Sequence, residues 1–130
     1  QNSLHYNQST SMITGSRLLV VKIGGSTISD LDTTLKDLVT LQRNGYAIVV
    51  VHGGGNVISQ WMERQGLVPR FIRGRRVTDA DGMETVIAVL AGLVNKQIVA
   101  SLTSLGAKTV GFTGVDGGML KLIYQIRKWD

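Results

Sequence analysis

The sequence predicts an α/β fold with a mainly parallel sheet, and three observations lead to that prediction. Ala47–Val51 is a continuous apolar, mostly β-branched run, as in a strand covered on both faces. Arg17–Ile23 is a similar run upstream, and a segment with helical periodicity separates the two. Met83–Leu105 then predicts a long apolar helix. Because two strands joined through a helix form a β-α-β unit, we expect them to lie parallel in one sheet, with a right-handed crossover.

The first predicted unit runs from the strand at Arg17–Ile23 to a capped helix. Gly24-Gly25 forms a glycine turn directly after the strand. Apolar residues then recur at helical spacing from Leu31 to Leu41, with Asp30 as the predicted N-cap. Asn44-Gly45 is the predicted C-cap, which ends the helix before the second strand.

The second strand ends in His52–Gly55, where three successive glycines let backbone N–H groups approach a ligand closely. Asn56 suits an N-cap, and the following apolar spacing predicts a helix that ends near Gln65-Gly66. A glycine turn that leads into a helix N-terminus is a ready site for a phosphate or another anion. The alternative interpretation is a tight turn without a ligand.

The second half of the chain is predicted to begin with a hairpin-like or irregular segment at Pro69–Val77, which is rich in arginine. Asp79 is the predicted N-cap of the long helix, and Gly106 its predicted end. Nearly every residue in Val86–Val94 is apolar or small, so we expect this helix to be buried on more than one face. Gly92 is expected to break or bend the helix, or to allow close packing.

Two further strands are expected, at Lys108–Phe112 and at Met119–Ile126, and a third glycine-rich loop, Thr113–Gly118, separates them. Each of the three glycine loops therefore follows a predicted strand. Open α/β sheets bind their ligands at the carboxyl ends of the strands, so the three loops are expected on the ligand-binding side.

The composition restricts the classes of function. The chain has no cysteine, which excludes disulfides and thiolate metal sites. Residues 1–16 are polar, without the apolar core of a signal peptide, and we expect a flexible tail there before one domain at 17–130. No apolar run reaches the length of a membrane span, so we expect a cytoplasmic protein with no membrane partner. The net charge is +5 but aromatic residues make up only 5%, which favours small anions over nucleic acid.

Two basic residues are candidates for binding anions. Lys22 lies two residues before the first glycine turn, where its ammonium can neutralise a polyphosphate or a transferring phosphoryl group. Arg76 can clamp a carboxylate through two parallel hydrogen bonds. For each, the alternative is a solvated surface cation. The sequence contains no P-loop motif, and an esterase is disfavoured because no G-x-S-x-G motif or downstream histidine follows His52.

Five motifs occur in an order that resembles the N-terminal half of N-acetylglutamate kinases, a branch of the amino acid kinase family. The resemblance covers Leu18 to about Leu120. The first two motifs are shared across the family, and the Arg-Val-Thr-Asp and Val-Asn-Lys motifs indicate the acetylglutamate branch. The motifs are Lys22–Gly25, Val50–Gly55, Gly74–Asp79, Val94–Lys96 and Gly114–Gly118.

The resemblance implies a three-layer αβα sandwich and ATP-dependent phosphorylation of the side-chain carboxylate of N-acetyl-L-glutamate, in arginine biosynthesis. ATP and Mg²⁺ are the implied cofactors, although the resemblance assigns no metal ligand to this chain. It also implies a homodimer through the helix at 83–105. Residues 17–130 correspond to the amino-acid-substrate-binding domain. The C-terminal nucleotide-binding domain is expected to be absent, so the chain alone is expected to be inactive.

The resemblance also assigns roles to individual residues. Lys22 is the catalytic residue that neutralises charge on the phosphoryl group, and Arg76 binds the α-carboxylate of the substrate. Arg75 departs from the family, which usually has leucine there. The phosphate-binding amides are those of Gly24, Gly25, Gly54 and Gly55, of which Gly54 and Gly55 also bind the substrate.

Three alternatives remain open at this stage. The first is a kinase for N-acetyl-aminoadipate or for another substrate of the same family. The second is a non-catalytic module that binds or senses small anions. The third is a basic nucleic-acid binder, which steep salt dependence of DNA binding would reveal.

Overall fold

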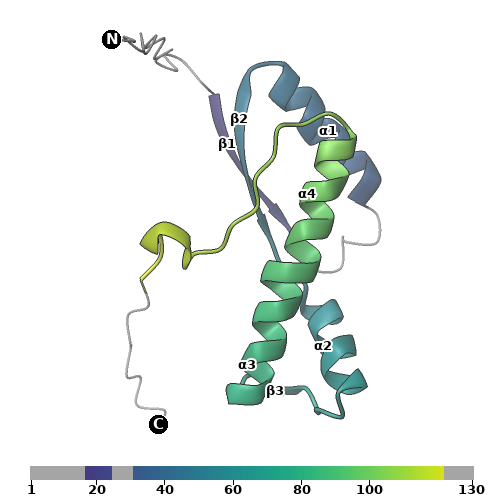
Figure 1. Ribbon diagram of the computed structural model, residues 1–130, viewed down its shortest axis with the longest axis vertical. Helices are drawn as coiled ribbons and strands as arrows, with labels where there is room; N and C mark the ends of the chain where they lie inside the picture. Colours follow the sequence, from purple (N-terminus) through teal and green to yellow (C-terminus); the bar gives the residue numbers. More distant parts are fainter. Residues whose placement is uncertain (1–16, 25–30, 122–130) are drawn as a thin grey trace, which may run out of the picture.

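A computed structural model describes residues 17–24 and 31–121 of the chain (Figure 1). A parallel strand pair lies beside a long helical rod, and a small hairpin lies at one end. The elements, in chain order, are β1 (Arg17–Ile23), α1 (Leu31–Arg43), β2 (Tyr46–His52), α2 (Gly55–Arg64), β3 (Arg70–Ile72), β4 (Arg75–Val77), α3 (Ala80–Ile87), η2 (Ala88–Val94), α4 (Asn95–Ser104) and η3 (Asp116–Gly118).

β1 and β2 pair in parallel, which confirms the predicted β-α-β unit. Ile23 pairs with His52, so both strands end at the same level and their following loops meet at one edge. One face of the pair is covered by the helices and contains the buried Ile23. The opposite face carries exposed apolar side chains, so the described residues cover the pair on one face only. These exposed residues are Leu18, Val20, Val49 and Val51.

The long helix begins and ends as predicted. Asp79 caps it, because its Oδ1 accepts a hydrogen bond from Gly82 N at 2.9 Å. Gly106 follows its last turn with a φ of 92°, a conformation that favours glycine. Gly92 does not provide close packing, since no atom lies within 4 Å of where its Cβ would be. The helix instead continues through Gly92 with the wider turns of the π-helical segment η2.

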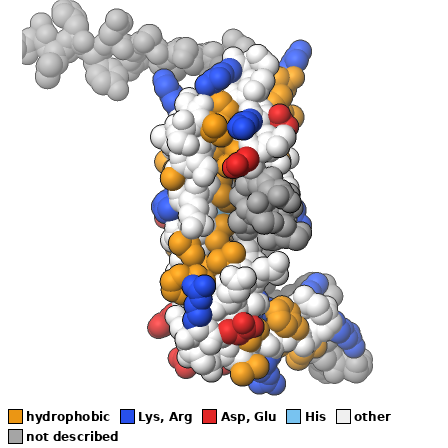
Figure 2. Space-filling view, turned by 90° about the vertical axis from the view of Figure 1, so that its right-hand side faces the viewer, with side chains coloured by type: hydrophobic (Ala, Val, Ile, Leu, Met, Phe, Trp, Pro, Cys, Tyr) orange, Lys and Arg blue, Asp and Glu red, His pale blue; other side chains and the backbone are white. Residues whose placement is uncertain are grey.

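The hydrophobic core lies between this helix, α1, α2 and the covered face of the strand pair. By length and composition alone, Ala80–Ser104 could also cross a membrane, contrary to the sequence-based expectation that no segment could. A core helix meets the same criteria, and this one contributes four residues to the core. They are Val89, Val94, Ile98 and Leu102. Figure 2 shows further hydrophobic side chains along one face of the molecule.

β3 and β4 form an antiparallel hairpin, as the segment Pro69–Val77 predicted. Ile72 pairs with Arg75, so Arg73 and Gly74 form a two-residue turn, with φ values of 49° and 74°. Positive φ at both central residues is the geometry of the tight turns that suit the twist of a hairpin. The hairpin connects the end of α2 to the start of the long helix.

The predicted ends of the two shorter helices have different outcomes. α1 ends at Asn44-Gly45 with Gly45 at a φ of 87°, as predicted. The prediction of Asn56 as the N-cap of α2 was wrong, because the helix begins at Gly55 and Asn56 lies inside its first turn. The helix therefore starts within the glycine turn, and no side chain caps its first N–H groups. Asp30 lies outside the described residues.

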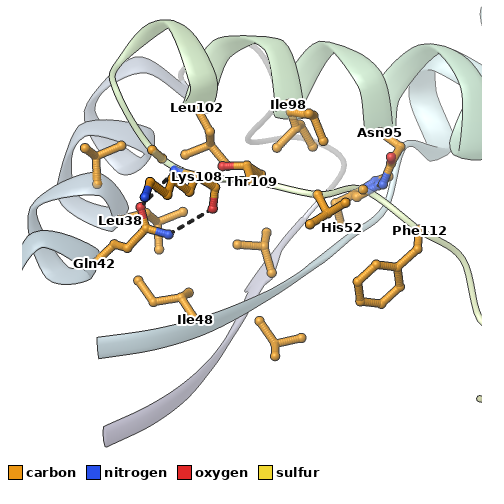
Figure 3. Close-up of a pocket in the computed structure, with 17 residues that line it drawn as sticks. Leu38, Gln42, Ile48, His52, Asn95, Ile98, Leu102, Lys108, Thr109 and Phe112 are labelled. Atoms are coloured by element: carbon orange, nitrogen blue, oxygen red, sulfur yellow. Dashed lines mark hydrogen bonds between the residues drawn. The ribbon is translucent and has the colours of Figure 1, made fainter. Parts of the chain in front are cut away.

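The predicted strand at Lys108–Phe112 is not formed. The Gln42 side chain bonds both backbone groups of Lys108, with Nε2 donating to the carbonyl at 3.1 Å and Oε1 accepting from the amide at 3.3 Å (Figure 3). A cavity of about 360 Å³ lies between this segment and β2. Extended backbone becomes a strand only when another strand pairs with it. Residues 119–121 of the other predicted strand, Met119–Ile126, are not a strand either, and the rest of it lies outside the described residues.

Candidate functional site

The glycine turn after β2 lies at the carboxyl end of the strand pair. Gly53 N donates to Ile23 O at 3.1 Å, which ties the turn to the end of β1. Gly54 is the N-cap of α2, and its carbonyl accepts the first helical hydrogen bond, from Ile58 N at 2.9 Å. The first N–H groups of α2 have no partner within the helix, so this end of the sheet presents amide donors and the positive end of the helix dipole.

The two glycines of this turn have different surroundings. Gly54 is buried, and a Cβ there would lie 2.7 Å from Leu90 Cδ2 and 3.4 Å from Val94 Cγ2. Gly55 is exposed, and no atom lies within 4 Å of the position that its Cβ would take. Gly54 therefore lets the turn pack against η2, whereas the space beside Gly55 is open to a ligand.

The structure brings most of the predicted site residues to the same end of the sheet. Lys22 is exposed and lies one residue before the final pair of β1 and β2. Gly24 directly follows β1, at the edge where Gly54 and Gly55 follow β2. Gly25 lies outside the described residues. Lysine and backbone amides at one edge are suited to binding the oxygens of a phosphoryl group.

Arg76 reaches from β4 to the first turns of α2. Its Nη2 donates to Gly55 O at 3.0 Å and to Ser59 Oγ at 2.7 Å, and its Nη1 to Met62 Sδ at 3.3 Å. The guanidinium also lies 4.7 Å from the ring centre of Phe71, a cation–π contact. Three of its five N–H donors are thus engaged within the protein. A bound carboxylate has to use the other donors or displace one of these partners.

A polar group that the sequence analysis did not assign to the site lies beside the glycine turn. Asn95 is buried at the start of α4, and its Nδ2 lies 3.2 Å from His52 Nε2 (Figure 3). Lys96 Nζ donates to Asn95 Oδ1 at 3.1 Å and to Gly111 O at 2.9 Å. The signal for this group was Asn95-Lys96 after a long apolar run, because a buried polar side chain needs a partner.

The third glycine loop is held by its own side chains. Asp116 Oδ2 accepts hydrogen bonds from Thr113 N at 2.6 Å and from Thr113 Oγ1 at 3.1 Å. These bonds, and to a smaller extent the charge of Lys96, hold the pKa of Asp116 below its ordinary value of 3.8. Because the folded pKa is lowered, these bonds stabilise the turn above the unfolded pKa, and that stabilisation is lost as pH falls through the folded value.

The fit to the implied cofactors is partial. The amides of the glycine turn and Lys22 fit the phosphoryl groups of a nucleotide. Within the part of the chain that the structure describes, no group of three or more His, Asp or Glu side chains is placed to hold a metal ion. The 360 Å³ cavity is lined mainly by apolar residues, so it suits neither a triphosphate nor a hydrated cation.

The comparison with protein families decides the family. Residues 17–128 match the profile of the amino acid kinase family. This chain belongs to the amino acid kinase family. The match includes both glycine turns, Arg76 and the Asn95-Lys96 pair. The predicted family and the predicted α/β fold class are therefore confirmed.

Curated members of the family that are similar to this chain include three acetylglutamate kinases. The enzyme of Dehalococcoides mccartyi is 45% identical over 103 residues, which cover 79% of this chain and 38% of that protein. That of Prochlorococcus marinus is 44% identical over 106 residues, with 79% and 35% covered. That of Methanopyrus kandleri is 46% identical over 101 residues, with 78% and 38% covered. This amino acid kinase chain thus spans less than two fifths of their length.

Solved structures support the same fold. A protein of Streptococcus mutans, smu.665, matches with a TM-score of 0.64 at 35% identity, over 69% of this chain and 37% of that one. The N-acetylglutamate synthase of Neisseria gonorrhoeae, solved with coenzyme A and N-acetyl-glutamate, matches with a TM-score of 0.60 at 27% identity. The second match covers 72% of this chain and 22% of that one.

Proposed function

We propose that this chain is the amino-acid-substrate-binding portion of an enzyme that phosphorylates the side-chain carboxylate of N-acetyl-L-glutamate, a step of arginine biosynthesis. The observation that carries the proposal is the identity of about 45% with acetylglutamate kinases along 79% of the chain. The geometry adds support, because Lys22, Gly24 and the turn at Gly54-Gly55 lie at the carboxyl end of the strand pair, and Arg76 donates to the Gly55 carbonyl.

In this proposal, each element performs one task. The ammonium of Lys22 neutralises the negative charge that the phosphoryl group carries between donor and acceptor. The amides of Gly24, Gly25, Gly54 and Gly55 hold phosphoryl oxygens, and Arg76 binds the α-carboxylate of the substrate. ATP with Mg²⁺ supplies the phosphoryl group, and most of the nucleotide site lies in a domain outside these 130 residues. We further propose a cytoplasmic homodimer that contacts neither nucleic acid nor membrane.

The test is a calorimetric titration of the chain with N-acetyl-L-glutamate, N-acetyl-L-aminoadipate and L-glutamate. We expect saturable binding of N-acetyl-L-glutamate and weaker binding of the other two ligands. Stronger binding of N-acetyl-L-aminoadipate would identify it as the preferred substrate instead, within the same family. A salt-dependent complex with an oligonucleotide, and no effect of N-acetyl-L-glutamate, would contradict the proposal.

A further inference from the structure

The polar side chains beside the glycine turn form a hydrogen-bond chain whose direction is fixed at one end. The Lys96 ammonium has only donors, and it donates to Asn95 Oδ1 at 3.1 Å and to Gly111 O at 2.9 Å. The Asn95 oxygen must therefore face Lys96, which leaves its amide NH₂ facing His52 Nε2 at 3.2 Å. The reverse orientation of Asn95 would place an NH₂ group against an ammonium group.

This direction assigns the tautomer of His52. Because Nε2 accepts from Asn95, the proton of the neutral ring is on Nδ1. Nδ1 lies 3.0 Å from Gly53 O, so in this tautomer it donates to that carbonyl. In the other tautomer, Nδ1 would carry no proton to donate to the Gly53 carbonyl. Nε2–H would then face the NH₂ group of Asn95, so that two donors would meet.

The Gly53 carbonyl shares a peptide unit with the N–H of Gly54. In a planar trans peptide, the carbonyl and the N–H point in opposite directions. The bond from His52 therefore also fixes the direction of the Gly54 N–H, which points away from the ring. The close approach of Gly54 to Leu90 prevents the turn from moving further toward the helix.

Gly111 belongs to the same arrangement. A Cβ at Gly111 would collide with Asn95 Oδ1 and would lie 2.7 Å from Val99 Cγ2. Only a residue without a side chain lets the segment after α4 come close enough for its carbonyl to meet Lys96. The lysine is thereby held between two acceptors, one on its own helix and one on the segment that leads to the third glycine loop.

We propose that Asn95 and Lys96 are positioning residues, which act through His52 to orient the Gly54 N–H for binding a phosphoryl oxygen. The inference rests on the proposed anion-binding function of the glycine turn. It assigns a role to the polar pair in the middle of the long helix, where an apolar residue would otherwise serve the core better.

The first test measures the tautomer. His5 and His52 are the two histidines of the chain, so long-range ¹H–¹⁵N correlation spectra identify His52 by comparison with His5→Gln. At about pH 8, where an ordinary histidine is neutral, we expect the proton on Nδ1. Asn95→Asp keeps the shape but replaces the donor by an acceptor, and should place a proton on Nε2. Gln97→Glu, an exposed change of the same kind two residues away, should leave the His52 spectrum unchanged.

The second test measures the consequence for anion binding, with inorganic pyrophosphate as the probe. Losing one oriented donor should weaken binding about fivefold in Asn95→Asp, against less than about twofold in Gln97→Glu, which adds the same charge. If Asn95→Asp does not fold, Lys96→Met provides the test, because the freed Asn95 amide should give a mixture of His52 tautomers.

Each other outcome has a defined meaning. An Nε2–H tautomer in the unmodified chain, or a switched tautomer with unchanged pyrophosphate affinity, would overturn the positioning role and leave the anion site intact. Absence of pyrophosphate binding to the unmodified chain would overturn the proposed function of the turn, and the positioning role with it.

Discussion

Gly54 and Gly55 are adjacent, and each lacks a side chain for a different physical reason. At Gly54 the helix comes so close that a Cβ would lie 2.7 Å from Leu90 Cδ2. At Gly55 the space is open, so only an approaching ligand would meet a side chain there. The sequence motif contains glycine at both positions and does not distinguish them. The structure shows that Gly54 is required for packing against η2, whereas Gly55 leaves open space for a ligand.

This difference predicts that two matched substitutions affect different properties, stability at Gly54 and anion binding at Gly55. Gly54→Val should overpack the contact with η2 and lower the free energy of unfolding by about 1–3 kcal/mol. Gly55→Val should leave the stability nearly unchanged but weaken pyrophosphate binding, because its side chain occupies the space of the anion. Thermal unfolding and a pyrophosphate titration of both variants provide the measurement. Equal stability of the two variants would contradict the packing role of Gly54.

Arg76 and Arg75 are neighbours on β4 that should differ in importance. Arg76 is half-buried and is held by Gly55 and Ser59, whereas Arg75 is exposed. Lysine cannot reproduce the planar fork of arginine, so Arg76→Lys should weaken N-acetyl-L-glutamate binding at least tenfold, or about 1.4 kcal/mol. Arg75→Lys is the matched control and should change the affinity little. The opposite ranking, measured by calorimetry, would remove Arg76 from the substrate site.

At the level of whole elements, glycine is favourable in the turn of the hairpin and unfavourable inside the long helix. Gly74 has a φ of 74° in the hairpin turn, so Gly74→Ala should destabilise the hairpin by about 1–2 kcal/mol. Gly92 is exposed inside the helix without a positive φ, so Gly92→Ala should stabilise the chain by about 0.5–1 kcal/mol. Amide hydrogen exchange measures both changes. Stabilisation by Gly74→Ala would be incompatible with a positive φ at this position.

The segment Lys108–Phe112 could not be predicted correctly from its local sequence pattern. Its apolar composition is that of a strand, and the β1–β2 pair was predicted correctly from similar runs. A strand also needs a partner at its edge, and here Gln42 and Lys96 bond the backbone of the segment instead. These three bonds join residues that lie 66 or 15 positions apart, which periodicity within a short window cannot reveal.

In the candidate site, too, local sequence predicted some positions and missed others. The position of Lys22 beside the glycine turns followed from the β-α-β unit, because parallel strands end at one edge. The contact of His52 with Asn95 joins residues 43 positions apart and depends on the register that the π-helical turns of η2 give to α4. No spacing rule for a regular helix would have placed Asn95 there.

At the scale of the whole molecule, the long helix leaves apolar side chains on the surface. Ile87 is 59% exposed and Met83 also faces solvent, whereas Val89 on the same helix is only 2% exposed. If the chain forms a homodimer through this helix, Ile87→Glu should yield a folded monomer, because it places a charge in the interface. Val89→Glu is the contrasting variant and should unfold the chain. Sedimentation velocity with circular dichroism measures both, and a monomeric unmodified chain would contradict the dimer.

Residues 1–130 alone are expected to give no detectable catalysis. Phosphoryl transfer requires donor and acceptor to be held in line, and a misplaced donor lowers the rate by orders of magnitude. The chain spans 35–38% of the length of the similar acetylglutamate kinases, and the proposed nucleotide domain is outside it. A coupled ADP-release assay with N-acetyl-L-glutamate, ATP and Mg²⁺ should therefore give no substrate-dependent turnover. Turnover in the usual range of about 1–10³ s⁻¹ would show that these residues contain a complete active site.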